Sequence, residues 1–385
     1  MEEVINCKSA YYTFDIRVLK DRIKYLRKAL PKDTKICYAI KANSFIVREI
    51  DNYIDKYELC SPGEVRICDA LGIESNKTVI SGVYKTPEII ESYIQASNNR
   101  TYTVESMNQF VLLDDLSKKY EKKLRILLRL TNDSQFGINE EEIENIISDR
   151  EEYRYLDIAG IQYFTGTQKN SLKKISREIN KVDDLLDKLK DKYGYKAREF
   201  EYGSGFYVPY FECDDYDEDS FIQEFTNIIN NMRNKCDFTL ELGRSIAACC
   251  GKYYTHIVDI KRNCSINYAL VDGGMHHMTY YGQSMAMKKP FMHVCNKKNN
   301  IELVEYNICG SLCSMNDIIV KQVKMPELEI GDTICFDNVG AYCMTECLSL
   351  FLTRDIPAVY LLQENGKIEC VRDSKEVFDL NCPIY

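Results

Sequence analysis

The chain has 385 residues, of which 50 are basic and 59 are acidic, so its formal net charge is −9. Hydrophobic residues make up 45% of the chain, which excludes an intrinsically disordered protein and fits folded domains with a sizeable core. The acidic balance gives no general attraction to nucleic acid or to an anionic membrane surface. No apolar run reaches the roughly 18 residues that cross a bilayer, and no signal peptide is evident. We therefore expect a cytoplasmic protein whose 17 cysteines are reduced thiols.

Residues 35–243 alternate between short apolar runs and charged segments with a helical period. The segment 171–193 is the clearest helix, with an apolar stripe that runs from Leu172 to Leu189 in steps of three and four. A similar stripe surrounds Phe221 and Phe225. The apolar runs predicted as strands are KICYAI (35–40), YELCS (57–61), KTVISG (77–82), RTYTV (100–104), LRILLRL (124–130), DIAGIQYF (157–164), EFEYG (199–203) and DFTLELG (237–243).

Eight strands that alternate with helices predict a closed (β/α)8 barrel. A doubly wound open sheet is the alternative, but the first strand-to-helix turn, IKANSF, has no glycine-rich fingerprint. After about residue 250 the long helical stripes end, and short or alternating apolar runs follow, separated by turns such as ENGK at 364–367. This part of the chain predicts a mostly β second domain.

Active sites of (β/α)8 barrels lie at the carboxyl ends of the strands. The predicted strand ends carry a lysine, two carboxylates, an aromatic ring, an arginine and glycine-rich turns. These residues are Lys41, Glu64, Phe164, Gly166, Thr167, Gly203, Ser204, Gly205, Glu241, Gly243 and Arg244.

This combination suits pyridoxal phosphate. A lysine at the barrel mouth can bond to the aldehyde of the cofactor, and glycines at 203 and 205 let backbone N–H groups approach a phosphate. Arg244 offers a fork of donors for the phosphate or for a structural carboxylate. Glu241 can hold a proton on the pyridine nitrogen, which makes the ring a strong electron sink.

Seven motifs extend the pattern over nearly the whole chain: YAIKAN, CSPGE, YGSGF, ELGRS, VDGGM, GSLCSMND and NVGAY. In this order they resemble the fold-type III pyridoxal-phosphate decarboxylases, the diaminopimelate and ornithine decarboxylase family. The resemblance implies a barrel over residues 15–250 and a β domain made of residues 1–14 and 251–385. It also implies a homodimer whose active sites are shared between the subunits.

The resemblance assigns a role to each matching residue. Lys41 matches the lysine that carries the cofactor, and Glu241 matches the partner of the pyridine nitrogen. Cys313 matches the thiol that reaches in from the neighbouring subunit and protonates the carbanion. Asp317 matches the acidic residue that follows this thiol. The matching phosphate ligands are Thr167, Gly205, Gly243, Arg244 and Tyr342, and the matching carboxylates under the cofactor are Glu58 and Glu64.

Departures from the family pattern bear on the substrate. Phe164 stands where the family commonly stacks a histidine on the cofactor, and Ser314 stands beside Cys313 where an acidic residue grips the distal amine. No arginine follows VDGGM in MHHMTYYGQ. We therefore expect Ser314, Asp317 and Tyr342 to face a neutral-tailed or carrier-bound amino acid. Diaminopimelate or ornithine remains the alternative, with Glu346 as the group that would take the amine.

Three other interpretations stay open at this point. Cys309, Cys313, Cys343 and Cys347 have a spacing that suits four thiolate ligands of zinc, but we expect no metal, and we interpret His276–His277 as loop or core histidines. An amino-acid racemase is disfavoured because Glu241, rather than an arginine, faces the pyridine nitrogen. A catalytically inactive binding protein of the same fold is disfavoured by the presence of both Lys41 and Cys313.

Overall fold

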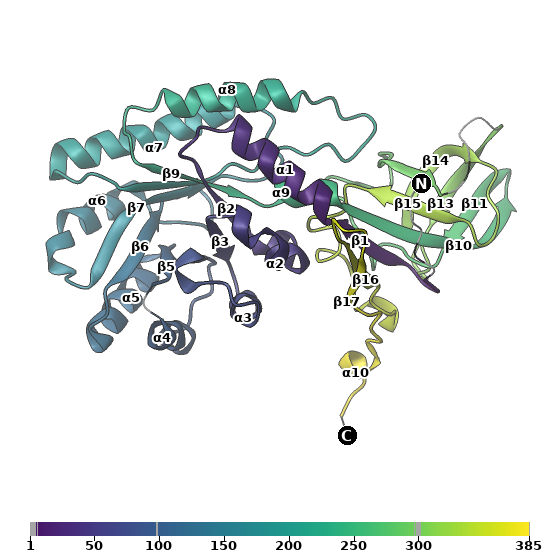
Figure 1. Ribbon diagram of the computed structural model, residues 1–385, viewed down its shortest axis with the longest axis horizontal. Helices are drawn as coiled ribbons and strands as arrows, with labels where there is room; N and C mark the ends of the chain where they lie inside the picture. Colours follow the sequence, from purple (N-terminus) through teal and green to yellow (C-terminus); the bar gives the residue numbers. More distant parts are fainter. Residues whose placement is uncertain (1–4, 6, 98, 296, 298–301, 385) are drawn as a thin grey trace. The chain divides into compact units, whose positions relative to one another are not determined.

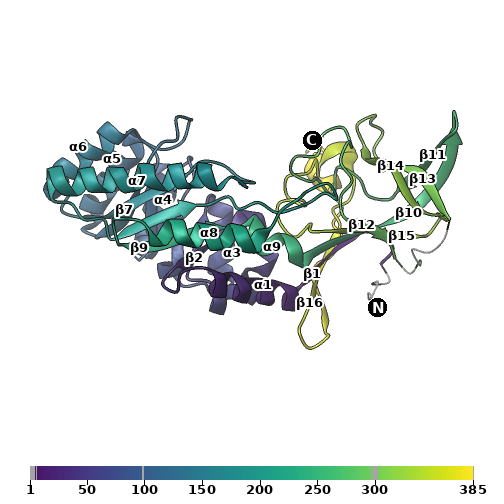
Figure 2. The same cartoon turned by 90° about the horizontal axis from the view of Figure 1, so that it is seen from above.

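A computed structural model describes residues 5, 7–97, 99–295, 297 and 302–384 of the chain. The chain divides into two compact units (Figures 1 and 2). One unit comprises residues 23–207 and 217–245, and the other comprises residues 1–22, 208–216 and 246–385. This division differs in short segments from the boundaries expected from the sequence, 15–250 for the barrel and 1–14 with 251–385 for the β domain, which remain a proposal.

The first unit is built on a closed barrel of eight parallel strands, as predicted. The last barrel strand pairs with the first, with Cys37 opposite Glu241, and this closure excludes the doubly wound open sheet. The strands are β2 (Lys35–Ala39), β3 (Lys56–Leu59), β4 (Thr78–Ile80), β5 (Thr101–Val104), β6 (Leu124–Arg129), β7 (Leu156–Phe164), β8 (Glu199–Gly203) and β9 (Asp237–Leu242).

Helices follow the barrel strands and cover the outside of the barrel (Figure 1). The predicted helix at 171–193 is α7 (Leu172–Tyr193), which begins after Ser171, whose hydroxyl accepts a hydrogen bond from the Lys174 backbone, and ends at Gly194 with φ 64°. The remaining helices of the sequence up to residue 247 are α1 (Ile16–Ala29), α2 (Val47–Ile50), α3 (Pro62–Ala70), α4 (Pro87–Ala96), α5 (Met107–Tyr120), α6 (Glu140–Ser148), α8 (Glu218–Asn230) and α9 (Arg244–Ala247).

The second unit contains a nine-stranded sheet in the order β14-β13-β11-β10-β1-β16-β17, with β15 paired to β10 and β12. This confirms a mostly β domain, and β1 from the N-terminal stretch pairs with both β10 and β16. The elements of this unit are β1 (Tyr11–Asp15), β10 (Gly251–Asn263), β11 (Ile266–Val271), β12 (Met292–Val294), β13 (Leu303–Cys309), β14 (Ile318–Pro326), β15 (Thr333–Asp337), β16 (Ala358–Leu362), β17 (Ile368–Arg372) and α10 (Phe378–Asn381).

The predicted turn at 364–367 joins β16 to β17. The Gln363 backbone donates to the Lys367 carbonyl at 2.8 Å, and Gly366 adopts φ 81°, a conformation that glycine reaches without strain. Residues 1–4 and 6 of the N-terminal stretch, and Ile301 among the apolar runs after residue 250, lie outside the described residues. Among the helices of the described residues, none has both the length and the apolar character needed to span a bilayer.

Candidate active site

Lys41 follows β2 in a short 3₁₀ turn, Ile40–Ala42. Its Nζ lies 2.7 Å from Glu58 Oε2 and 3.4 Å from Cys60 Sγ, and its side chain is 41% exposed. Burial raises the pKa of Glu58, but the Lys41 ammonium, together with Arg129 and the Cys60 thiol, holds that pKa below its usual value. The barrel mouth therefore presents an accessible amino group that is fixed in place by a buried carboxylate.

Glu241 is the second-last residue of β9 and is 8% exposed. The Gln162 side chain on β7 donates from Nε2 to Glu241 Oε1 at 2.7 Å. Burial, and next the nearby Glu58 carboxylate, raise the pKa of Glu241 to about 7. A cation placed against this carboxylate would gain from both the charge and the low polarity of its surroundings.

The predicted glycine turn lies beside the loop that follows β7. Gly205 has φ +56°, and a Cβ at this position would come within 2.1 Å of the Gly166 carbonyl oxygen. Gly166 has φ +131° and faces open space. The Lys169 backbone donates to the Gly205 carbonyl at 2.8 Å and so joins the two loops. Thr167 lies within the first of these loops, and Arg244 begins α9 directly after Gly243.

Lys169 holds together the loop that follows β7 and the glycine turn, a role that the sequence did not predict. Its Nζ forms an ion pair with Glu178 at 2.7 Å and contacts the Tyr202 hydroxyl at 3.2 Å and the Gly203 carbonyl at 3.4 Å. The side chain is 3% exposed. Glu178 lies on α7, so this buried ion pair ties the glycine turn to a helix.

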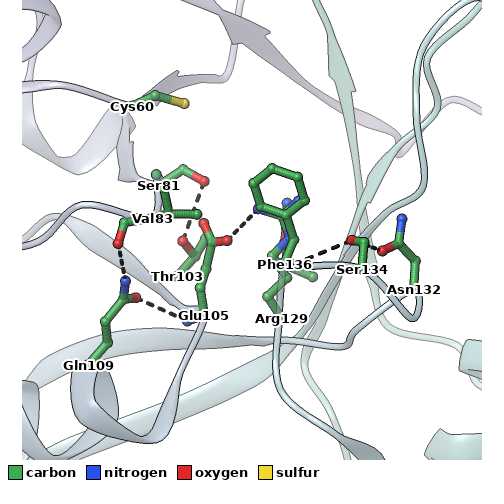
Figure 3. A network of polar contacts seen from close by, with 12 residues as sticks. Cys60, Ser81, Val83, Thr103, Glu105, Gln109, Arg129, Asn132, Ser134 and Phe136 are labelled. Atoms are coloured by element: carbon green, nitrogen blue, oxygen red, sulfur yellow. Dashed lines mark hydrogen bonds and ion pairs between the residues drawn. The ribbon is translucent and has the colours of Figure 1, made fainter.

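Arg129 at the end of β6 is surrounded by a carboxylate and two aromatic rings. Its Nη1 lies 2.7 Å from Glu105 Oε2, and its guanidinium lies 4.9 Å from the Phe136 ring and 5.9 Å from the Phe164 ring. Figure 3 shows this ion pair within a polar network in which Gln109 binds the backbone of Glu105 and Val83. Phe164 therefore lies beside an arginine whose charge is already neutralised by the Glu105 carboxylate.

Glu64 is placed by the start of α3. The Ser61 hydroxyl accepts a hydrogen bond from the Glu64 backbone, and the Glu64 carboxylate accepts one from the Cys60 backbone at 2.5 Å. Burial raises the pKa of Glu64. The carboxylate thus organises the turn that carries Cys60, next to Lys41.

The residues present fit pyridoxal phosphate. The barrel mouth contains an accessible lysine amine, a buried carboxylate at the end of another strand, and a two-loop cradle in which Gly205 has no room for a side chain while Gly166 borders open space. These features supply, in turn, an attachment point for the aldehyde, an anion for the ring nitrogen and backbone donors for the phosphate.

The remaining predicted site residues belong to the sheet unit. Cys313 is exposed, Ser314 is partly buried, and Tyr342 adopts φ 65°. Asp317 is 2% exposed, and its carboxylate oxygens accept hydrogen bonds from the backbones of Met275 and Leu312, both at 2.8 Å. The predicted residues at the barrel strand ends, among them Lys41 and Glu241, therefore lie in one unit, and these four residues lie in the other.

The alternative of a zinc site with four thiolates finds no support. In the described part of the chain, the only group of three potential ligand atoms within 4.8 Å is His293, Cys335 and Asp337, so the four cysteines of this alternative are not brought together. His276 and His277 are 1% and 7% exposed, and burial lowers the pKa of His276 to about 3. Both are core histidines.

Residues 16–256 match the family model described as pyridoxal-dependent decarboxylase, pyridoxal binding domain. Three curated relatives match nearly the whole chain. An L-glutamyl-[BtrI acyl-carrier protein] decarboxylase of Niallia circulans is 25% identical and covers 95% of this chain and 91% of its own. A 2-[(L-alanin-3-ylcarbamoyl)methyl]-2-hydroxybutanedioate decarboxylase of Staphylococcus aureus is 26% identical over 92% and 94%. A diaminopimelate decarboxylase of Helicobacter pylori is 25% identical over 97% and 95%.

Solved structures share the fold. The diaminopimelate decarboxylase of Helicobacter pylori in complex with L-lysine superimposes with a TM-score of 0.85 at 24% identity, covering 97% of this chain and 96% of its own. A lysine/ornithine decarboxylase of Vibrio vulnificus superimposes with a TM-score of 0.82 at 18% identity, covering 93% and 95%.

Proposed function

The chain belongs to the pyridoxal-dependent decarboxylases, and from this premise we propose that it decarboxylates an amino acid that has no free distal amine. It is a pyridoxal-phosphate-dependent amino-acid decarboxylase, a carboxy-lyase. Its substrate, the roles of its site residues, its dimeric state and its location are the parts that we propose.

The barrel residues hold and orient the cofactor. Pyridoxal phosphate supplies the electron sink that accepts the electron pair left when carbon dioxide departs. Lys41 would bond to the aldehyde carbon, and Glu241 would keep a proton on the ring nitrogen. The Phe164 ring would stack on the pyridine. The phosphate would be bound by Tyr342 of the sheet unit and by barrel residues, namely Thr167, Gly203, Ser204, Gly205, Gly243 and Arg244.

Cys313 delivers a proton to the α-carbon in this proposal. Cys313 is exposed on the loop 310–317, and the neighbouring Met315 is 95% exposed. Exposure of a large apolar side chain two residues from this thiol supports a homodimer in which this loop enters the site of the other subunit. A cytoplasmic location is supported by 17 free cysteines.

The loop around Cys313 carries the substrate argument. Within residues 310–317 the only carboxylate is Asp317, and both of its oxygens already accept backbone hydrogen bonds. Ser314 presents a hydroxyl that accepts from the Asn316 backbone at 3.3 Å. An ammonium placed here would lack an anionic partner, which costs several kcal/mol when the charge is buried.

A neutral or tethered tail avoids this cost. Two of the relatives act, by name, on an aminoacyl carrier protein and on an amide-linked alanine derivative. Ser314, Asp317 and Tyr342 would then border an amide or thioester linkage rather than an amine, and the partner would be a small amino acid or an aminoacyl carrier protein.

The substitution Ser314→Asp tests this proposal. It supplies the missing carboxylate, so kcat/KM for meso-diaminopimelate and L-ornithine should rise by about tenfold or more. Asn316→Asp is the matched control, since it adds the same charge at an exposed position two residues away and should not raise the rate. No rise in Ser314→Asp, together with efficient use of diamino acids by the wild type, would contradict the proposal.

Efficient use of diamino acids by the wild type would favour diaminopimelate or ornithine as substrate instead. Glu346, which is exposed four residues after Tyr342, would then be the group that takes the amine, and Glu346→Gln should abolish that activity. The absence of a visible cofactor band from purified protein would favour an inactive binding protein.

A further inference from the structure

A second buried acid, Glu201, lies in the barrel interior near Glu241. Glu201 is on β8, two residues before Gly203, and its register partners are Gln162 on β7 and Thr239 on β9. Its side chain is 0% exposed. Side chains two residues apart on a strand share a face, so the alternation that points Glu199 inward also points Glu201 inward.

Several ionisable groups face Glu201 from the surrounding strands. They are Cys37 on β2, Lys56 on β3, Glu199 on β8 and Glu241 on β9. Lys56 is the cation among them, and its Nζ lies 3.7 Å from Glu201 Oε2, beyond hydrogen-bond distance. Lys56 donates to Glu199 instead, which also accepts from Arg125 at 2.8 Å and from Thr239 at 2.7 Å. Lys56 and Arg125 therefore hydrogen-bond to Glu199, and Lys56 reaches Glu201 only as an ion pair without a hydrogen bond.

The Glu201 carboxyl group receives no hydrogen bond from the described part of the chain. Among the described residues, neither of its carboxylate oxygens has a hydrogen-bond donor, whereas an ionised carboxylate in a buried site needs several. The Glu241 carboxyl group, on the neighbouring strand β9, interacts with Glu201 closely enough to raise its pKa. Two carboxyl groups can share a hydrogen bond only if one of them carries a proton. Two adjacent buried carboxylates, moreover, cannot both be ionised at low cost.

We propose that Glu201 is a positioning residue that stays protonated at neutral pH and donates its hydrogen bond to the Glu241 carboxylate. Glu241 then receives two donors, the Glu201 hydroxyl and Gln162 Nε2, the latter at 2.7 Å. The pair carries one proton and one negative charge, and this charge remains on Glu241. The part of the inference that concerns the cofactor nitrogen rests on the proposed function.

A neutral Glu201 also agrees with the hydrogen bonding of the buried polar side chains around it. Gln162 Oε1 is buried and lacks a donor among the described residues, so these side chains are short of donors rather than of acceptors. Burial raises the pKa of Glu201 well above its usual range; the Lys56 ammonium opposes this shift, and the Glu241 and Glu199 carboxylates add to it. A protonated acid adds a donor where an ionised one would add two further unsatisfied acceptors.

Infrared difference spectroscopy of the cofactor-free protein at pH 8.5 tests the proton directly. Wild type should show the carbonyl band of a protonated carboxylic acid, and Glu201→Gln should lack it. Glu241→Gln is the matched control and should keep the band at a shifted position, because the acceptor changes from a carboxylate to an amide. A band missing from wild type, a band that survives in Glu201→Gln, or a band lost or unshifted in Glu241→Gln would overturn the proposal.

The cofactor provides an independent readout. Glu201→Gln keeps a neutral donor, so its affinity for pyridoxal phosphate should stay within about threefold of wild type, whereas Glu201→Leu should weaken it about tenfold or more. Equal affinities in both variants, or a Glu201→Gln protein that no longer folds, would overturn the proposal, since the latter result requires an ionised Glu201 paired with Lys56. A wild-type protein that shows the infrared band but no decarboxylation would instead contradict the proposed function alone.

Discussion

The ionised carboxylate of Glu241 serves the cofactor in the proposed function, but its burial lowers the stability of the cofactor-free protein. Its pKa is raised to about 7 by burial and by the Glu58 carboxylate. Between the ordinary value of about 4.5 and 7, the folded protein holds a proton that the unfolded chain has released. The free energy of unfolding of the cofactor-free protein should therefore fall as the pH rises through this window.

Glu241→Gln removes this titration, so we expect the stability of the cofactor-free protein to rise and the decarboxylation rate to fall. At pH 8 the cofactor-free variant should be more stable than wild type, by on the order of 1–3 kcal/mol, while the two should converge near pH 5. Its decarboxylation rate should fall about tenfold or more, because an amide cannot supply the charge that keeps the ring nitrogen protonated. Denaturant unfolding between pH 5 and 8 and steady-state rates check both statements. Unchanged turnover would contradict the assigned role.

Some site residues could be predicted from the sequence, and others could not. Lys41 and Glu241 stand at predicted strand ends within recognisable motifs. Gln162 and Glu201 precede the strand ends by two residues, and in EFEYG the alternation of acidic and aromatic residues is typical of a strand with one face in water. In a closed barrel both faces are buried, so polar alternation marks an interior ion-pair layer that only the closure of the barrel reveals.

The two loops that form the phosphate cradle depend on the backbone of Gly205. Gly205→Ala should weaken pyridoxal phosphate binding about tenfold or more, because its Cβ would lie 2.1 Å from the Gly166 carbonyl oxygen. Gly194→Ala is the matched control, since Gly194 also has positive φ, 64°, but a Cβ there meets nothing within 4 Å. Cofactor titration of both variants checks the prediction, and equal affinity would contradict it.

The main elements follow from local patterns, and the exceptions have physical reasons. The stripe from Leu172 to Leu189 predicts α7 within one residue of its observed start, and the glycine at 366 predicts the β16–β17 turn. The strand β12 (Met292–Val294) was not predicted because three residues carry too little alternation to be distinguished from a loop. Asp317 stays a predicted substrate residue; that its carboxylate accepts backbone bonds from Met275 and Leu312 was not predicted, because such bonds depend on loop geometry.

The proposed dimer makes Lys41 and Cys313 members of one site from two different subunits. Lys41→Ala and Cys313→Ala should each be inactive as pure proteins. After subunit exchange in an equal mixture, half of the dimers are hybrids with one intact site of two, so about a quarter of the wild-type activity should return. Steady-state carbon dioxide release before and after exchange measures this recovery.

A second mixture controls for nonspecific recovery. Lys41→Ala and Glu241→Ala each remove a site residue that the barrel unit contributes. Every site of their hybrids therefore lacks one of the two residues, and the mixture should stay at the level of the separate variants. If the Lys41→Ala and Cys313→Ala mixture also stays inactive although subunit exchange is demonstrated, the shared site is contradicted.

Substrate choice by the wild-type holoenzyme is the most direct test of the account as a whole. Carbon dioxide release should be compared for an L-glutamyl thioester, meso-diaminopimelate and L-ornithine under identical conditions. The account predicts turnover of the thioester and kcat/KM values for both diamino acids at least about tenfold lower, because the loop that carries Cys313 and Ser314 offers no free carboxylate to an amine. A kcat/KM at or above about 10⁴ M⁻¹s⁻¹ for either diamino acid would contradict it.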